Sequence, residues 1–263
     1  MPILGTVESL WRYPVKSMRG EAMSEAFIGF SGVYGDRCYA VKNADARKGF
    51  PYLNATAHPQ MLHYRPQFRS PERAAHPPNL MEAMNIAPGV NPANAEPGDL
   101  MLDVVTPSGA VVAVDDPALL TMLGEGLRGE PRLTLVRSDR ALTDCRPVSL
   151  MSLQTIRQVE AELGFRLDQQ RFRANIYVNL AEHDGFAEDA WVGRRLRIGA
   201  SAEILILERD PRCMMISLDP DTGEHTPIVL RNIAKAHANF AGVYCAVLVE
   251  GVLTQGDSID LLD

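Results

Sequence analysis

Four short segments of the sequence carry side chains of the types that bind anions or soft metals. The first, residues 13–17, has the sequence Tyr-Pro-Val-Lys-Ser. A Lys beside a Ser on a turn fixed by proline can hold a phosphate through its charge and through a hydroxyl hydrogen bond. The second, residues 35–37, is Gly-Asp-Arg, with an acid next to a base at the start of an expected strand. Taken alone, the first segment also fits a solvated surface turn and the second a structural ion pair.

The third segment, residues 171–176, is Arg-Phe-Arg-Ala-Asn-Ile. Arginine makes planar, bidentate contacts with anions, and the Asn side chain both donates and accepts hydrogen bonds. The fourth, residues 210–213, is Asp-Pro-Arg-Cys, in which the Arg can stabilise a negatively charged sulfur on Cys213. Each of these segments also has a structural interpretation, as an edge strand and as a buried cysteine respectively.

The composition is that of an acidic globular protein of 263 residues, long enough for one large or two small domains. Hydrophobic residues make up 46% and charged residues 22%, which excludes disordered, collagen-like and coiled-coil classes. The 26 Lys and Arg against 33 Asp and Glu give a net charge of −7. This balance argues against general nucleic-acid binding, and it still allows a local cationic pocket for an anion.

The apolar runs and the cysteines predict a soluble, cytoplasmic protein. Residues 241–253 are interrupted by Glu250 and are too short to span a membrane. The first twenty residues do not have the pattern of a signal peptide. The four cysteines, Cys38, Cys145, Cys213 and Cys245, have no short metal-type spacing, so we expect reduced thiols.

The elements that must position these side chains are short. The 18 Pro and 20 Gly residues favour many strands over long helices. Helices are expected from Asp116 to the glycines at 124–129 and over residues 152–163, and a long irregular insertion over 66–99. Strands are expected over residues 2–10, 21–29, 36–41, 100–105, 111–114, 133–136, 175–180, 194–198, 202–207, 214–218, 244–250 and 259–262. The pattern indicates a mainly β (α+β) fold of antiparallel barrels with a few covering helices.

In this order, the motifs YPVKS, GDR, RFRxN, RC and DPDTG together resemble the MOSC-domain proteins that carry an associated N-terminal barrel domain. Within that group the sequence is most similar to the mitochondrial amidoxime-reducing component and its bacterial relatives. The resemblance spans about residues 3–262 and is weak only across the insertion. It implies two β-barrel-like domains, residues 1–115 and 116–263, with a cofactor cleft between them.

The resemblance also implies a molybdenum–molybdopterin cofactor whose metal is bound by a single cysteine, and Cys213 matches that position. Thiolate is the protein ligand that suits a soft metal centre. By the same resemblance, the phosphate end is expected at Lys16, Ser17 and Arg37, and the pterin or phosphate at Arg173, Asn175 and Arg212, with Asp144 and Ser149 completing the pocket. The sequence departs from the family at Ala174, where Pro is usual, and after the cysteine, where Met214, Met215 and Ile216 replace Thr-rich residues. The second departure makes the surroundings of the metal more apolar and puts the substrate preference in doubt.

The leading hypothesis is a molybdenum-dependent reductase of N-hydroxylated compounds, namely amidoximes, hydroxylamines and N-hydroxylated bases. The N–O bond would be cleaved with two electrons and two protons at the Cys213-bound metal. Because no iron–sulfur, flavin or nicotinamide motif is found, the electrons are expected from a separate protein of ferredoxin, flavin or cytochrome type. The alternatives are a non-catalytic carrier of the cofactor or of sulfur through Cys213, and a barrel that binds a different anion. No nucleic-acid or membrane partner is expected.

Overall fold

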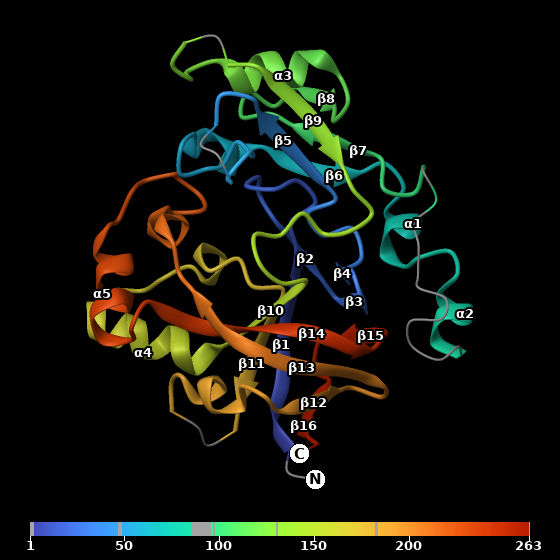
Figure 1. Cartoon of the computed structure of the whole chain (residues 1–263), viewed down its shortest axis with the longest axis vertical. Helices are drawn as coiled ribbons and strands as arrows, with labels where there is room; N and C mark the ends of the chain where they lie inside the picture. The colour runs from blue at the N-terminus through green and yellow to red at the C-terminus, as the bar shows by residue number, and fades with distance from the viewer. Residues whose placement is uncertain are drawn as a thin grey trace.

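The computed structural model describes residues 3–46, 49–85, 96, 98–129, 131–181 and 184–262. The fold is mainly β, as the sequence predicts, and consists of a closed barrel below a second unit of smaller sheets (Figure 1). None of the helices in the described ranges is long and apolar enough to cross a lipid bilayer.

Within the described residues, seven strands close into a barrel. Their order around it is β11 (Ile176–Leu180), β10 (Val148–Ser152), β14 (Phe240–Val249), β13 (Ala202–Pro211), β12 (Arg195–Ile198), β16 (Ser258–Leu261) and β1 (Ile3–Arg12), which pairs back with β11. The β10–β11 pair is parallel, and the other pairs are antiparallel. A short strand, β2 (Glu21–Met23), adds to β1. Closure gives every barrel strand two hydrogen-bonded neighbours.

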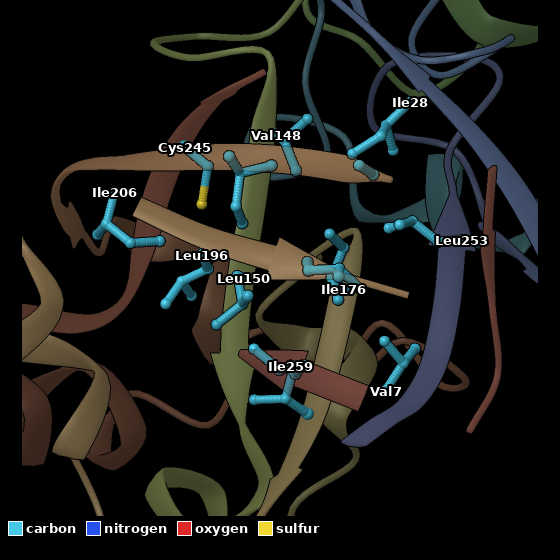
Figure 2. Close-up of a cluster of buried hydrophobic side chains, with 14 of the residues drawn as sticks. Val7, Ile28, Val148, Leu150, Ile176, Leu196, Ile206, Cys245, Leu253 and Ile259 are labelled. Atoms are coloured by element: carbon cyan, nitrogen blue, oxygen red, sulfur yellow. The ribbon is translucent and has the colours of Figure 1, made fainter. Parts of the chain in front are cut away.

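Apolar side chains fill the barrel (Figure 2). Along β13 the inward residues Ala202, Ile204 and Ile206 are fully buried, and the residues between them are partly exposed. This alternation is the period of two that a strand with one buried face requires. Because side chains occupy the interior of a barrel this small, the barrel is a rigid platform and not a binding cavity.

The second unit lies above the barrel in Figure 1 and has its own core, which includes Met61, Leu102, Leu119 and Leu123. Its elements are β5 (Tyr39–Asn43) paired with β9 (Leu133–Arg137), the sheet β6 (Arg65–Phe68), β7 (Leu102–Val105) and β8 (Val111–Ala113), the 3₁₀ helix η1 (Pro59–His63) and the helix α3 (Pro117–Gly124). As predicted, Asp116 caps α3, since its side chain accepts a hydrogen bond from the Ala118 N–H.

A further sheet, of β3 (Glu25–Gly29), β4 (Gly32–Val33) and β15 (Gly251–Thr254), joins residues from near the two ends of the chain. Strand pairing also crosses the predicted domain boundary at residue 115, because β1 pairs with β11 to close the barrel and β9 pairs with β5. The division into domains 1–115 and 116–263 stays a prediction.

Two helices cover one side of the barrel. The predicted helix α4 (Leu153–Leu163) begins at Ser152, whose side chain accepts a hydrogen bond from the Thr155 N–H, and ends at Gly164, where φ is 78°. The sequence did not predict α5 (Ile228–Ala236), which lies beside α4 (Figure 1). Both helices bury apolar residues, such as Val159 and Ile233, in a third cluster. Two further 3₁₀ helices are η2 (Gln169–Arg171) and η3 (Ala187–Trp191).

Some sequence expectations are wrong. Residues 214–218 were expected to form a strand, but they contain the 3₁₀ helix η4 (Met214–Ser217), because the chain turns after Cys213 and closes a backbone bond from Leu218 N to Met215 O. The strand expected over 21–29 is broken at Ser24 into β2 and β3. The strands β10 and β15 were not predicted as such.

The segment 66–99 was expected to be irregular, and this too is wrong for much of its described part. It contains most of β6, the helix α1 (Pro71–Ala75) and the helix α2 (Leu80–Asn85). The α1 turn is fixed from the barrel side, since the buried Arg12 guanidinium donates a hydrogen bond to Ala74 O. Residues 86–95 and 97 lie outside the described residues.

The close approach of β1 and β11 requires glycine at position 5. A Cβ there would lie 2.2 Å from Asn179 O and 2.8 Å from Leu180 Cα, both of which are backbone atoms that cannot turn away. We expect Gly5→Ala to lower the free energy of unfolding by about 1–3 kcal/mol, as overpacking does, measured by urea denaturation.

The matched control is Gly124→Ala, at the end of α3, where the nearest atom to an added Cβ is 3.6 Å away. This change is expected to be neutral or slightly stabilising, because it lowers only the entropy of the unfolded chain. Equal stability of the two variants would contradict the assigned barrel closure.

Candidate functional site

One cavity of about 470 Å³ collects the residues that the sequence singles out. Its walls come from both units, with residues 16–56 on one side and residues 143–244 on the other. The cavity is lined by all nine predicted site residues: Lys16, Ser17, Arg37, Asp144, Ser149, Arg173, Asn175, Arg212 and Cys213. The predicted cleft therefore has a physical counterpart, although the role of each residue in it stays a prediction.

Lys16 is positioned by the turn that follows β1. A β-bridge joins Val15 to Tyr39, and the Lys16 N–H donates to Tyr39 O over 2.8 Å. The buried Lys16 ammonium donates to Asp144 Oδ1 at 2.8 Å and to Leu142 O at 2.9 Å. Burial lowers the pKa of Lys16, although the Asp144 carboxylate opposes the shift. Asp144 itself is largely exposed, so solvent screens its half of this ion pair.

Arg37 and Arg173 bring two guanidinium groups to the same cavity. Arg37 pairs with the buried Asp36 carboxylate and donates through Nη2 to the Arg173 carbonyl at 3.1 Å. Arg173 has no carboxylate within salt-bridge distance among the described residues, and its Nη2 is buried without a hydrogen-bond partner there. Burial lowers the pKa of Arg173 to about 10, and the charge of Arg37 adds to the shift, against the opposing effect of Tyr13.

Three of the lining residues have left-handed backbone conformations. The φ angles are 68° at Ser17, 46° at Arg37 and 52° at Arg173. Each such residue without glycine's freedom costs about 1–2 kcal/mol, so the surrounding hydrogen bonds must hold it in place. The backbone N–H groups of Arg37 and Arg173 donate to Tyr13 O at 2.8 Å and to Gln170 O at 3.2 Å. Three of the six non-glycine residues with positive φ in the described parts of the chain thus line this cavity.

Asn175 and Ser149 line the cavity but bind each other. The Asn175 Oδ1 accepts hydrogen bonds from the Ser149 N–H and hydroxyl at 3.2 and 3.3 Å. The Asn175 Nδ2 donates to Trp11 O at 3.2 Å. These bonds join β10 and β1 to the residue directly before β11, which fixes the backbone between Arg173 and the barrel.

Arg212 has most of its donors engaged by the protein. Its Nε and Nη1 donate to Ala241 O at 2.7 Å and to Phe172 O at 2.8 Å. Its Nη2 lies 2.9 Å from the buried Asp210 carboxylate but lacks the geometry of a hydrogen bond. Burial raises the pKa of Asp210, against the opposing charge of Arg212. Arg212 thereby fixes the end of β13, directly before Cys213.

Cys213 follows β13 with extended backbone and begins η4, and its side chain is exposed toward the cavity that it lines. Met214, which is 47% exposed, and Met215 line the cavity next to it. Cys38 and Cys245 are buried, and burial raises the pKa of the Cys38 thiol to about 12. Cys145 is exposed but is not a lining residue, and burial followed by the charge of Asp144 raises its pKa.

Sequence reasoning missed several lining residues. Arg171 was noticed within its motif but was not assigned to the site. Its Nη2 donates to Asp219 Oδ2 at 2.7 Å, and its buried Nε and Nη1 have no partner among the described residues. A whole stretch, residues 49–56, contributes lining residues without any motif, and its Tyr52 ring centroid lies 5.6 Å from the Lys16 Nζ. The sequence also suggested the proline-rich segment 66–99 as a rim of the site; no described residue of it lines the cavity, and residues 86–95 and 97 lie outside the described residues.

The residues that line the cavity have an excess of positive charge and of hydrogen-bond donors, and the space between them is partly shielded from water. A buried donor without a partner costs about 1–3 kcal/mol, and Arg171, Arg173 and Arg212 all have such donors. A bound anion can supply the missing acceptors and compensate the charge. An accessible thiol in the same cavity adds a ligand for a soft metal.

Comparison with known proteins gives two domain matches. Residues 137–260 match the MOSC domain, and residues 4–84 match the MOSC N-terminal beta barrel domain. Over 83 residues the chain is 34% identical to mitochondrial amidoxime reducing component 2 of Macaca fascicularis and 35% identical to that of Rattus norvegicus. This stretch covers 32% of the chain and 23% of the length of each of these relatives.

Two solved structures match the chain at low sequence identity. The YUAD protein from Bacillus subtilis is 13% identical, with 97% of this chain and 93% of that chain covered at a TM-score of 0.47. YiiM from Geobacillus stearothermophilus is 18% identical, with 45% of this chain and 55% of that chain covered at a TM-score of 0.36.

The strained turn at Ser17 allows its backbone and its hydroxyl to be tested separately. Ser17→Gly relieves the left-handed conformation, so we expect the free energy of unfolding to rise by about 1 kcal/mol in urea denaturation. Ser17→Ala keeps the strain and leaves stability nearly unchanged. Both variants lack the hydroxyl and are expected to bind inorganic phosphate more weakly by about 0.5–1.5 kcal/mol, measured by calorimetric titration.

Lower stability of Ser17→Gly would show that the turn is not strained. Wild-type phosphate affinity in Ser17→Ala would show that the hydroxyl does not contact the anion.

Proposed function

Since the chain belongs to the MOSC-domain proteins with a MOSC N-terminal β-barrel domain, we propose that its cavity binds a molybdenum–molybdopterin cofactor and that the protein reduces N-hydroxylated compounds. The single observation that carries the proposal is the cavity itself. Cationic side chains from segments far apart in the sequence and the exposed Cys213 line the same space.

The residues present suit this cofactor by their chemistry. A pterin phosphate needs several charge-assisted donors, and the orphaned guanidinium donors of Arg171 and Arg173 are in surplus for the protein alone. Molybdenum held by sulfur is a soft centre, for which the Cys213 sulfur is a suitable ligand. The residues proposed to hold the cofactor are Lys16, Ser17, Arg37, Arg173 and Arg212 at its anionic and pterin portions, with Asp144, Ser149 and Asn175 completing the walls and Cys213 on the metal.

When bound, the cofactor supplies a metal centre that delivers two electrons for the cleavage of an N–O bond. The protein's own residues orient the bound groups and exclude water from the cavity. Arg212, fixed by the carbonyl oxygens of Ala241 and Phe172, holds the backbone before Cys213 in one place. Met214 and Met215 give the wall beside the sulfur an apolar surface that favours the uncharged part of a substrate.

The proposed reaction takes up two electrons and two protons and converts an amidoxime or hydroxylamine into the amine-type product and water. Its electrons are proposed to come from a separate donor protein of ferredoxin, flavin or cytochrome type. The exposed position of Cys213 supports this proposal, because the thiol side of the cavity is open to a docking protein.

The same exposure also suits the second candidate, a carrier that holds the cofactor or a persulfide on Cys213 without catalysis. The two functions differ in a direct way. A carrier takes up molybdenum or sulfur but does not turn over an N-hydroxylated substrate with any electron donor.

Cys213→Ser tests the proposed metal ligand. We expect protein from a molybdenum-competent host to lose most of its molybdenum, measured by elemental analysis, while its circular dichroism stays that of the wild type. The matched control is Cys145→Ser, which removes the other exposed thiol and is expected to keep its molybdenum. Retention of the metal in Cys213→Ser, or its loss in Cys145→Ser alone, would contradict the assignment.

The dependence on the electron donor tests the reaction. Molybdenum-loaded protein with reduced viologen is expected to convert an amidoxime to the amidine, measured by chromatography, whereas NADH or NADPH alone gives no product. Efficient turnover with NADH alone would contradict the need for a separate donor. An absence of turnover with every donor in loaded protein would favour the carrier.

A further inference from the structure

The Tyr13 side chain contacts two of the guanidinium groups that line the cavity, without lining the cavity itself. Tyr13 is fully buried directly after β1. The guanidinium carbon of Arg173 lies 4.1 Å from the centroid of its ring, and that of Arg37 lies 4.9 Å away. Both distances are within the range of about 6 Å over which an aromatic face attracts a cation. The ring therefore lies on the protein side of the two arginines.

The two arginines need such a partner because their charges repel. Arg37 is compensated by the buried Asp36 carboxylate. Arg173 has no carboxylate at salt-bridge distance in the described parts of the chain, and the charge of Arg37 acts on it from nearby. Within those residues, the Tyr13 ring lies directly against the Arg173 guanidinium, with its centroid 4.1 Å from the guanidinium carbon, while the Asp36 carboxylate favours the positive charge from beyond salt-bridge distance.

An aromatic ring stabilises a guanidinium differently from a carboxylate. The face of the ring attracts the cation without accepting its N–H donors, which stay available. A carboxylate would accept those donors and neutralise the charge, as Asp36 does for Arg37. An arginine whose N–H groups must bind an anion in the cavity is therefore better stabilised by an aromatic ring than by a carboxylate.

The position of the Tyr13 ring is fixed relative to both arginines. Its backbone N–H donates to Asp36 Oδ1 at 2.7 Å, and its backbone carbonyl accepts from the Arg37 N–H at 2.8 Å. Its hydroxyl donates to Ala174 O at 3.3 Å, next to Arg173 in the chain. One buried residue thus joins the GDR and RFRxN segments, which lie more than a hundred positions apart in the sequence.

We propose that Tyr13 is a positioning residue whose ring holds Arg37 and Arg173 charged and aligned for the anionic ligand of the cavity. The inference rests on the anion-binding part of the proposed function and not on the metal or the reaction. It assigns to the tyrosine of the YPVKS motif a role in ligand binding through the two arginines.

The test is the binding of inorganic phosphate to the metal-free full-length protein, measured by calorimetric titration, with the melting temperature recorded with and without phosphate. Tyr13→Leu removes the ring and is expected to weaken phosphate binding about 3- to 30-fold, the range of a cation–π contact. Tyr13→Phe keeps the ring and loses the hydroxyl bond, so its affinity is expected to stay within about twofold of the wild type. Arg173→Ala serves as the positive control for a lost anion contact.

Phe27→Leu controls for general destabilisation, because Phe27 is a buried aromatic residue of β3 that does not line the cavity. It is expected to lower the melting temperature while the shift produced by phosphate stays unchanged. If Tyr13→Leu proves too unstable, Tyr13→Met, which keeps more of the side-chain volume, replaces it in the same comparison.

Equal phosphate affinity of the Tyr13→Leu and wild-type proteins would overturn the proposal, as would equal losses in the Phe and Leu variants. A wild-type protein that does not bind phosphate would also overturn it. Failure of the proposed reductase function gives a different result. In that case the protein binds phosphate in this pattern but neither acquires molybdenum nor turns over substrate.

Discussion

Electrostatic repulsion among buried cations is the constraint that the rest of the site must satisfy. Lys16, Arg37 and Arg173 line one cavity, and the two arginine charges both act to lower the pKa of Lys16. The protein as a whole has a net charge of −7, so this concentration is local. Like charges at short range in a medium of reduced dielectric destabilise the folded state unless fixed partners or a bound anion compensate them.

The fold opposes this repulsion by fixing the backbone of the cavity walls. It does not neutralise every charge. The first strand helps to close the barrel, and the residues that directly follow it include Tyr13, which contacts Arg37 and Arg173, and the lining residues Lys16 and Ser17. The barrel core, packed and closed, prevents these turns from relaxing away from one another. Two of the three left-handed residues at the cavity wall are held by hydrogen bonds from outside their own turns, since the Arg37 N–H donates to Tyr13 O and the Arg37 guanidinium donates to the Arg173 carbonyl. Strain is expected at such places when geometry serves binding.

The sequence predicted the chemistry of the site better than its enclosure. The nine site residues were assigned because the motifs in this order resemble one family, and each motif alone also had a structural interpretation; all nine residues line the cavity. Helix α4 was predicted from local signals, since Ser152 and Gly164 mark its ends. The stretch 49–56 was missed because its contribution depends on contacts distant in sequence, and η4 was mistaken for a strand because apolar residues in a short run do not distinguish the two.

The sequence alone also does not show which arginine has N–H donors available for an anionic ligand. Arg212 and Arg173 both lie in motifs and both line the cavity. The Arg212 donors are used by two backbone carbonyl oxygens, so this side chain gives charge and rigidity but little hydrogen bonding to a ligand. Arg173 rests on the ring of Tyr13, without a carboxylate partner among the described residues, and its N–H groups remain to be satisfied. Both guanidinium groups lie over an aromatic ring, so the difference is in their acceptors: Arg212 has the Asp210 carboxylate beside it, and Arg173 has no carboxylate partner among the described residues. Arg173 is therefore the better candidate for direct contact with the anion.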